Sequence, residues 1–309
     1  MLGSGETLLV SGATGLVGRR WLGALEGSGA TVRGLTRRPQ QAGLPGGAEA
    51  VGWNGLDVPP QVLAGATVVV HLAGEPIFGG LPSAGRRDRM HASRVLSTES
   101  LVAGIGQLTA SLRPRVLVCA SAVGIYAGRG EEILEENAEP GSGFLAKLCL
   151  DWEAAARRAE QHGVRVVSLR TGLVLAREGG VLAGLRPLFR LGLGGRVGSG
   201  RQWMPWIQVD DLGRLIEAVA MDESVRGPVN AVAPGIVRNR EFTAALAAQL
   251  GRPALLRIPG LALRAALRDL AGELLDSRRV VPARALAMGF RFEHAELGTA
   301  LAAELGPRT

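Results

Sequence analysis

Two residue types that can do chemistry each occur once in this chain of 309 residues: Tyr126, within "CASAVGIYAG", and Lys147, within "GFLAKLCL". The other 34 of its 35 basic residues are arginine. A phenol can exchange a proton with a reacting group. The pair therefore raises the hypothesis of an active site.

A glycine-rich turn follows the first β-like segment, "TLLVSG", and opens a helix-like one. Its glycines have G-x-x-G-x-x-G spacing. At a turn from strand to helix, such glycines allow a tight turn, a close approach of backbone to a pyrophosphate, and close packing of helix on strand. The alternative is a purely structural turn. We predict a dinucleotide site formed by Gly12, Ala13, Thr14, Gly15, Leu16, Val17 and Gly18.

The second β-like segment ends in "LTRRP" and indicates which dinucleotide binds. A cofactor with a free ribose 2′-hydroxyl usually meets Asp or Glu about 20 residues after the glycines. Here Thr36 is followed by Arg37 and Arg38, whose planar guanidinium groups suit a phosphate. We therefore predict NADP(H) as the cofactor. Two solvated arginines in a loop are the alternative.

A fourth β-like run, "VVVHLAGEPI", completes the predicted cofactor site. Its small residues allow backbone to lie against the adenosine side of a dinucleotide, whereas the sequence gives no role for Glu75. The predicted residues here are Leu72, Ala73, Gly74 and Glu75.

Short apolar runs alternate with helix-like stretches along the first 180 residues. This alternation favours an α/β fold, with a Rossmann-type doubly wound parallel sheet covered by helices on both faces. We predict a dinucleotide-binding domain over 1–180, with returning segments near 205–235. Residues 181–309 are expected to form most of a smaller C-terminal α+β substrate lobe.

Composition argues against several other classes of protein. No apolar run approaches the roughly 20 residues of a membrane span, and we expect a cytoplasmic protein. The net charge of +7 comes from arginines scattered over the whole chain, with only 4% aromatic residues, so we expect no nucleic-acid partner. The two cysteines and four dispersed histidines form no metal or disulfide pattern.

Several segments in order carry a family resemblance: "GATGLVG", "HLAGEPI", "SAVGIYAGRG", "GFLAKLCLDWEAAA" and "WIQVDDL". With them the chain resembles the extended short-chain dehydrogenase/reductase superfamily, in its NAD-dependent epimerase/dehydratase branch. It is most similar to the little-characterised "epimerase family protein" group, which has a C-terminal domain of unknown function. The resemblance implies a Rossmann domain that binds NADP(H), and a substrate that the group does not reveal.

The resemblance also implies catalytic positions, and two of them are changed. The superfamily uses Tyr-x-x-x-Lys and a Ser or Thr; Lys147 stands at the lysine's place, but Gly143 replaces the tyrosine and Ala122 the serine. Tyr126 matches a different tyrosine that lines the substrate pocket, and Ser121 precedes Ala122. The implied catalytic set is Ser121, Tyr126 and Lys147, with Lys147 on the cofactor ribose. A packed Tyr126 and an exposed Lys147 are the alternatives.

The substrate side departs from the branch as well. Met204 occupies the place of an arginine that grips a sugar-nucleotide diphosphate, although Arg196 or Arg201 could substitute. Trp203 and Trp206 make the surroundings apolar, or belong to the core. The predicted substrate-binding residues are Tyr126, Arg201, Trp203, Met204 and Trp206. Asp210 and Asp211 are expected to cap the next helix.

Two functions stay open at this point. The first is an NADP(H)-dependent oxidoreductase or epimerase-like enzyme acting on a small, partly apolar substrate. The second is a catalytically silent NADP(H)-binding sensor or interaction protein, loosely linked to cell division by some relatives. The helices expected around 83–109 and 143–161 are those that the branch pairs into a homodimer.

Overall fold

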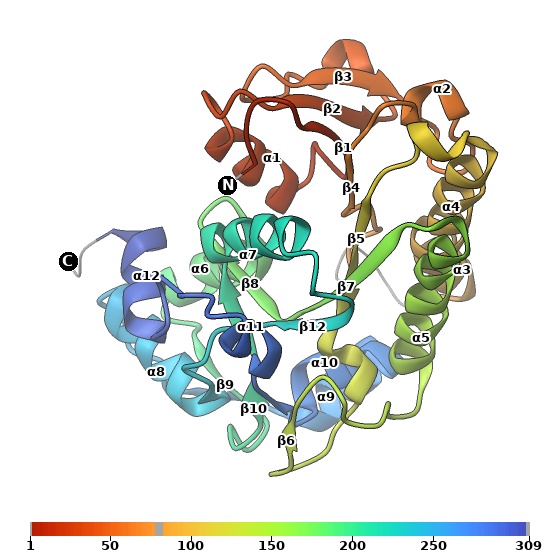
Figure 1. Ribbon diagram of the computed structural model, residues 1–309. Coiled ribbons are helices and arrows are strands. Elements are labelled where there is room, and N and C mark those ends of the chain that lie inside the picture. The colour runs from red at the N-terminus through yellow and green to blue at the C-terminus, as the bar shows by residue number, and fades with distance from the viewer. Residues whose placement is uncertain (1, 78–82, 307–309) are drawn as a thin grey trace. The chain divides into compact units, whose positions relative to one another are not determined.

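The computed structural model describes residues 2–77 and 83–306 of the chain (Figure 1). Two compact units interleave along the sequence. Unit 1 comprises Met1–Ser121, Leu148–Leu169 and Leu212–Val229, and unit 2 comprises Ala122–Lys147, Arg170–Asp211 and Asn230–Thr309. Unit 2 thus takes segments 122–147 and 170–180, which the sequence analysis assigns to the dinucleotide-binding domain.

A seven-stranded parallel sheet dominates the fold and confirms the predicted α/β Rossmann-type class. Its order is β12-β7-β5-β4-β1-β2-β3. The chain builds outward from β1 to β2 and β3, then returns to the other side of β1 with β4. Such a reversal is a topological switch point, where ligands bind beyond the carboxyl ends of the strands. The strands are β1 (Thr7–Ser11), β2 (Thr31–Thr36), β3 (Glu49–Gly52), β4 (Val68–His71), β5 (Val116–Ala122), β7 (Arg165–Thr171) and β12 (Gly227–Ala231).

Helices cover both faces of this sheet (Figure 1). On one face, Trp21 of α1 (Leu16–Ala24) donates its indole N–H to Glu217 of α7 (Val209–Met221) at 3.2 Å. On the other face, Trp152 donates to the hydroxyl of Thr98 at 3.0 Å. That face carries α3 (Ala84–His91), a π-helical turn (Ala92–Leu96), α4 (Ser97–Gln107) and α5 (Phe144–Arg157).

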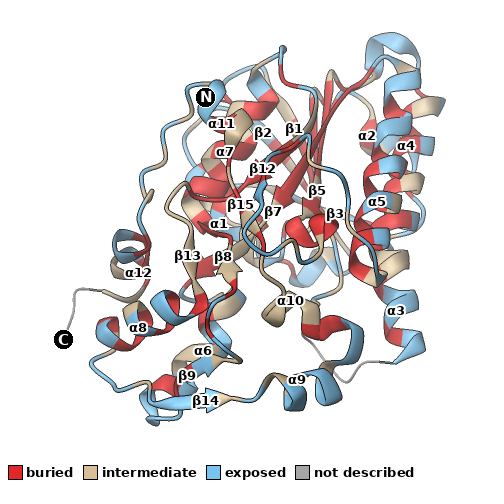
Figure 2. Cartoon of the chain, turned by 90° about the horizontal axis from the view of Figure 1, so that it is seen from below, coloured by how far each residue is buried: buried red, intermediate tan, exposed pale blue. Residues whose placement is uncertain are grey.

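The strands are buried on both sides, as their continuous apolar sequences require. Val68, Val69 and Val70 of β4 are at most 1% exposed. Figure 2 shows the buried residues concentrated along these strands and on the helix faces toward them. Shorter elements at the edge of unit 1 are α2 (Pro60–Leu63) and the 3₁₀ turns Pro39–Gln41, Ala110–Leu112 and Arg158–His162.

Unit 2 has its own apolar core, in which Trp206, Phe242, Leu246 and Leu301 are at most 1% exposed. Its strands form four two-stranded pairs: β8 (Leu173–Ala176) with β11 (Trp206–Gln208), β9 (Gly195–Val197) with β14 (Leu256–Ile258), β10 (Trp203–Met204) with β13 (Val237–Arg238), and β6 (Ile133–Leu134) with β15 (Arg279–Val280). Its helices are α6 (Gly180–Arg190), α8 (Asn239–Gln249), α9 (Gly260–Leu267), α10 (Gly272–Leu275), α11 (Ala283–Ala287) and α12 (Leu297–Leu305).

The prediction that Asp210 or Asp211 caps the helix is wrong. Helix α7 begins at Val209, so both aspartates lie in its first turn. The side-chain oxygen of Gln208 accepts from the N–H groups of Asp210 and Asp211 at 2.6 and 3.0 Å. The Asp211 carboxylate instead accepts from the backbone N–H groups of Glu293 and His294, and so ties two parts of unit 2 together.

Candidate functional site

The glycine-rich turn lies at the switch point between β1 and β4. Gly12 follows Ser11 with a backbone φ of +70°, which glycine adopts without strain. The Gly15 N–H donates to the Gly12 carbonyl at 2.9 Å, and Gly15 then stands at the N-cap of α1. No acidic residue lies in the first turn of α1. The amides at this helix end therefore suit an anion such as a pyrophosphate.

Two of the glycines are required by close packing. A Cβ on Gly12 would lie 2.7 Å from the Leu72 carbonyl carbon and 2.9 Å from the Ala73 nitrogen. A Cβ on Gly18 would lie 2.4 Å from the Gly12 carbonyl oxygen. The first contact brings the predicted segments 12–18 and 72–75 together within unit 1. The glycines thus let backbone pack on backbone at the switch point, which is what a dinucleotide-binding turn requires of them.

The end of β2 supplies positive charge beside this turn. β2 pairs with β1, so Arg37 and Arg38 follow the strand next to the glycine turn. Both side chains are exposed, and Thr36 accepts from the Arg38 N–H at 3.3 Å. Within the described ranges 2–77 and 83–306, no ion pair engages Arg37 or Arg38. These two guanidinium groups are thus available to a phosphate.

A buried, neutral histidine, His71, connects the strands that flank the glycine-rich turn. His71 is fully buried, and burial lowers its pKa to about 3. Its Nδ1 hydrogen-bonds to the Ser11 hydroxyl at 2.5 Å, and its Nε2 to the Ser97 hydroxyl at 3.2 Å. The Ser11 hydroxyl also accepts from the Ala73 N–H at 3.3 Å. His71 therefore links the ends of β1 and β4 to α4.

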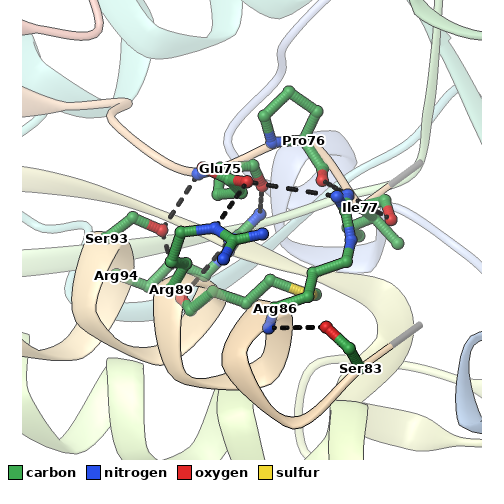
Figure 3. A network of polar contacts seen from close by, with 9 residues as sticks. Glu75, Pro76, Ile77, Ser83, Arg86, Arg89, Ser93 and Arg94 are labelled. Carbon is green, nitrogen blue, oxygen red and sulfur yellow. Dashed lines mark hydrogen bonds and ion pairs between the residues drawn. The ribbon is translucent and has the colours of Figure 1, made fainter. Parts of the chain in front are cut away.

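Glu75, whose role the sequence did not reveal, belongs to a network of arginines (Figure 3). Its carboxylate lies 3.5 Å from Arg89 Nε and 4.0 Å from Arg86 Nη1. Its N–H donates to the Ser93 hydroxyl at 2.9 Å, and its carbonyl accepts from Arg94 Nη2 at 2.9 Å. The residue thus anchors the loop after β4 to α3 and the π-helical turn.

Ser121 has a buried acidic partner that sequence analysis missed. Its hydroxyl donates to Glu153 Oε1 at 2.6 Å, and both side chains are 4% exposed. Ser121 lies near the carboxyl end of β5, and Glu153 lies on α5, within unit 1. A hydroxyl bonded to a carboxylate can pass on a proton, so this pair is chemically competent for acid–base work.

Gly143, at the position of the family's tyrosine, has a backbone conformation that disfavours any residue with a side chain. Helix α5 begins at Phe144, and Gly143 before it has a φ of +100°, a conformation that disfavours residues with a Cβ. The Lys147 N–H donates to the Gly143 carbonyl at 3.0 Å, which places Lys147 in the first turn of α5. Its side chain is exposed.

Tyr126 lies in a buried polar cluster of unit 2. Its hydroxyl donates to Asn230 Oδ1 at 2.7 Å and accepts from Arg170 Nη1 at 2.9 Å. The Glu136 carboxylate accepts from the Asn230 N–H at 2.9 Å, and the Glu136 carbonyl accepts from Arg170 Nη1 at 3.0 Å. Burial raises the pKa of Tyr126, although Arg170 opposes the rise. These contacts favour the packed-aromatic alternative, with side chains as the partners.

The predicted substrate residues divide into two groups within unit 2. Trp206 is fully buried in the core, where its indole N–H donates to the Gly235 carbonyl at 2.9 Å. Trp203 is half-buried, with the Arg238 guanidinium 4.3 Å from its ring centroid. Met204 pairs with Val237 across β10 and β13.

Arg201 lines a surface hollow that also includes Arg238, the residue stacked on Trp203. The hollow measures about 280 Å³ and is lined by Glu131, Arg201, Arg238 and Arg240. Arg238 makes a two-pronged bond to Glu131, at 3.0 and 2.9 Å. Three arginines and one glutamate therefore line this hollow.

Comparison with protein families decides the relationship. Residues 8–231 match the NAD dependent epimerase/dehydratase family, and residues 258–304 match a domain of unknown function, DUF1731. The chain belongs to the NAD dependent epimerase/dehydratase family. The resemblance inferred from the motifs is thereby confirmed, including its C-terminal domain.

Known members of this family cover nearly the whole chain. An epimerase family protein of Mycobacterium bovis is 38% identical over 295 residues, which cover 94% of this chain and 95% of the relative. The crystal structure of human epimerase family protein SDR39U1 with NADPH has a TM-score of 0.85 and 30% identity, and covers 97% of this chain and 99% of that chain. A nucleoside-diphosphate sugar epimerase from Corynebacterium glutamicum has a TM-score of 0.79 and 35% identity, and covers 98% of this chain and 59% of that chain.

The described residues carry neither a cluster of metal ligands nor a membrane-spanning helix. Among residues 2–77 and 83–306, no group of three or more His, Cys, Asp or Glu side chains could hold a metal ion. In the same part of the chain, no helix has the length and apolar character needed to cross a bilayer. The family description names a nicotinamide cofactor, NAD.

Proposed function

We propose that this protein binds NADP(H) and is an oxidoreductase or epimerase-like enzyme that acts on a small, partly apolar substrate. The observation that carries the proposal is the cradle, the close backbone packing of Gly12 on Leu72 and of Gly18 on Gly12 at the switch point, with the exposed Arg37 and Arg38 on the next strand. Only glycine allows this close backbone packing, because a Cβ at Gly12 would lie 2.7 Å from the Leu72 backbone and one at Gly18 would lie 2.4 Å from the Gly12 carbonyl oxygen. The NADPH bound by the human relative supports the choice of cofactor for this chain.

Named residues would hold each part of the cofactor. The amides at the start of α1 would bind the pyrophosphate, and Arg37 with Arg38 the 2′-phosphate. Lys147 would hold the nicotinamide ribose, as the family motif implies. The bound cofactor would supply hydride transfer, while the protein orients the substrate and moves the proton.

Ser121 with Glu153 is the proton-transfer pair that the geometry supports best. The hydroxyl and carboxylate oxygens are 2.6 Å apart and shielded from water. Tyr126 is less suited to abstract a proton, because burial raises its pKa and two partners occupy its hydroxyl. The substrate would lie against Trp203 and Met204, with Arg201 available for an anionic group.

The second candidate function is a catalytically silent NADP(H) sensor or interaction protein. It is favoured by Gly143, whose conformation disfavours the family's tyrosine, and by the occupied Tyr126 hydroxyl. For either function we propose a cytoplasmic protein that assembles as a homodimer.

A turnover screen separates the two candidates. The protein is incubated with NADPH or NADP⁺ and a panel of carbonyl and alcohol compounds, and absorbance at 340 nm is followed. The enzyme proposal predicts turnover with at least one compound, and a loss of about 100-fold or more in Ser121→Ala. Tyr126→Phe tests the phenol: reduced thermal stability with full turnover supports the packed role, and reduced turnover supports the catalytic one. If NADPH binds but no compound reacts, the sensor becomes the better conclusion.

A further inference from the structure

A buried arginine lies beneath the loop that follows β4. Arg94 is 9% exposed, and its guanidinium carbon lies 5.3 Å from the ring centroid of Trp152. The guanidinium donates to the carbonyls of Glu75, at 2.9 Å, and Met90, at 3.4 Å. A Cβ built on Gly74 would lie 3.2 Å from that same guanidinium carbon. Arg94 therefore occupies the space in which a side chain at position 74 would stand.

The π-helical turn Ala92–Leu96 explains how two adjacent residues reach the same loop residue. Ser93 and Arg94 both lie in this turn, and they bind the N–H and the carbonyl of Glu75 respectively (Figure 3). A π-turn adds a residue to the helical path and re-aims the side chains around it, and such turns are frequent at functional sites. Both backbone polar groups of Glu75, its N–H and its carbonyl, are therefore held by side chains of this turn.

A second arginine extends the clamp along the loop. Arg86, which is 3% exposed, donates to the carbonyls of Pro76 and Ile77, the latter at 3.0 Å. Over residues 74–77, no backbone–backbone hydrogen bond holds the loop to any part of the chain that the structure describes. The shape of the loop therefore depends on side chains, chiefly on Arg86, Ser93 and Arg94.

Stability alone does not explain this arrangement. Burial of a guanidinium removes it from water, and apolar residues of similar volume often stabilise a core as well or better. The loop held in this way directly continues the Leu72–Ala73 segment that packs on Gly12 at the switch point. Small displacements of such a segment alter ligand affinity strongly, since binding groups act only when they are well placed.

We propose that Arg94 is a positioning residue that holds the Gly74–Glu75 backbone in the conformation to which NADP(H) binds. This inference rests on the proposed function. It also gives Glu75 a role, because the backbone of Glu75 is the part that Arg94 and Ser93 hold.

The test compares NADPH affinity in Arg94→Lys and Arg94→Ala with that of the full-length wild-type chain, by calorimetry. Lysine keeps the charge but cannot bond two carbonyls with a planar fork. Both variants should raise the NADPH dissociation constant about 10-fold or more. Guanidinium chloride at about 10 mM should restore affinity to Arg94→Ala, whereas sodium chloride at equal ionic strength should not; such rescue is not expected from general destabilisation.

Arg165→Lys is the matched control. Arg165 is also a buried arginine that clamps carbonyls, those of Val219, Ala220 and Val225. It stands at the amino end of β7, away from the strand ends at which the cofactor is proposed to bind. Its substitution should lower the melting temperature and leave NADPH affinity within about twofold of wild type.

Gly74→Ala gives an independent perturbation should Arg94 variants fold poorly. The added methyl group would press on Arg94 Nη2, 3.3 Å away, and should weaken NADPH binding in the same direction. In the double variant of Gly74→Ala and Arg94→Ala, the loss of NADPH binding free energy should be smaller than the sum of the losses in the two single variants. Unchanged NADPH affinity in both Arg94→Ala and Gly74→Ala would overturn the positioning role alone. Absence of NADPH binding by the wild-type chain would overturn the proposed function as well.

Discussion

His71 should make the free energy of unfolding fall as the pH is lowered below about 6.5. Burial lowers its pKa from 6.5 to about 3 in the folded protein, so the folded state keeps the imidazole neutral where the unfolded chain protonates it. The unfolded state binds more protons in this window, and acidification therefore favours unfolding. The stabilisation is complete above pH 6.5 and is lost progressively down to about pH 3.

The size of this loss of unfolding free energy depends on how far the pH lies below 6.5, the ordinary pKa of the histidine. At pH 5 the loss is about 2 kcal/mol, since each pH unit below 6.5 contributes about 1.4 kcal/mol. His71→Asn removes the titrating group, so any fixed cost of the substitution is the same at both pH values. Urea unfolding of wild type and variant at pH 7.5 and pH 5.0 should show the wild type losing about 2 kcal/mol more than the variant.

The other three histidines are present in both proteins and cancel in this difference. A stability difference between wild type and His71→Asn that stays the same at both pH values would refute the reasoning. It would mean that burial does not keep the His71 imidazole neutral in the folded protein.

Three more predictions concern the glycine turn, a buried thiol and the dimer that the family resemblance implies. Gly18→Ala should abolish NADPH binding in titrations, because its Cβ would lie 2.4 Å from the Gly12 carbonyl oxygen; retained affinity would show that the cradle is not the binding site. Burial raises the pKa of the Cys119 thiol to about 12, so this cysteine should resist a thiol reagent at pH 8 until the protein unfolds, and rapid labelling in the native state would contradict its burial. The helices over 83–109 and 143–161 should form a homodimer interface, and light scattering that shows a monomer at all concentrations would reject it.

Local sequence signals predicted the fold and the place of the glycine-rich turn between β1 and α1. Glycine spacing, strand position and the alternation of elements act over a few residues each, and the sheet and the Gly12–Leu72 packing have the expected places. The C-terminal lobe was harder to predict, because its strands are two to four residues long and pair across wide sequence separations.

Side-chain partners that are distant in sequence could not be predicted. Tyr126 bonds residues 44 and 104 positions away, and Ser121 bonds a glutamate 32 positions away. The role of Glu75 depends on a π-turn, and a sequence pattern does not distinguish such a turn from an ordinary helix. Capping by Gln208 was missed because Asp is the commoner residue at a helix start, whereas here the helix begins one residue earlier.

The measurement that tests the central claim most directly is calorimetric titration with NADPH and with NADH, for the wild-type chain and for Arg37→Ala. A charge-assisted contact with the 2′-phosphate is worth about 1.5 to 3 kcal/mol, so wild type should bind NADPH about 10-fold or more tightly than NADH. Arg37→Ala should lose most of this preference and leave NADH affinity unchanged. Equal affinity for the two cofactors, or NADPH binding that is indifferent to Arg37→Ala, would contradict the account.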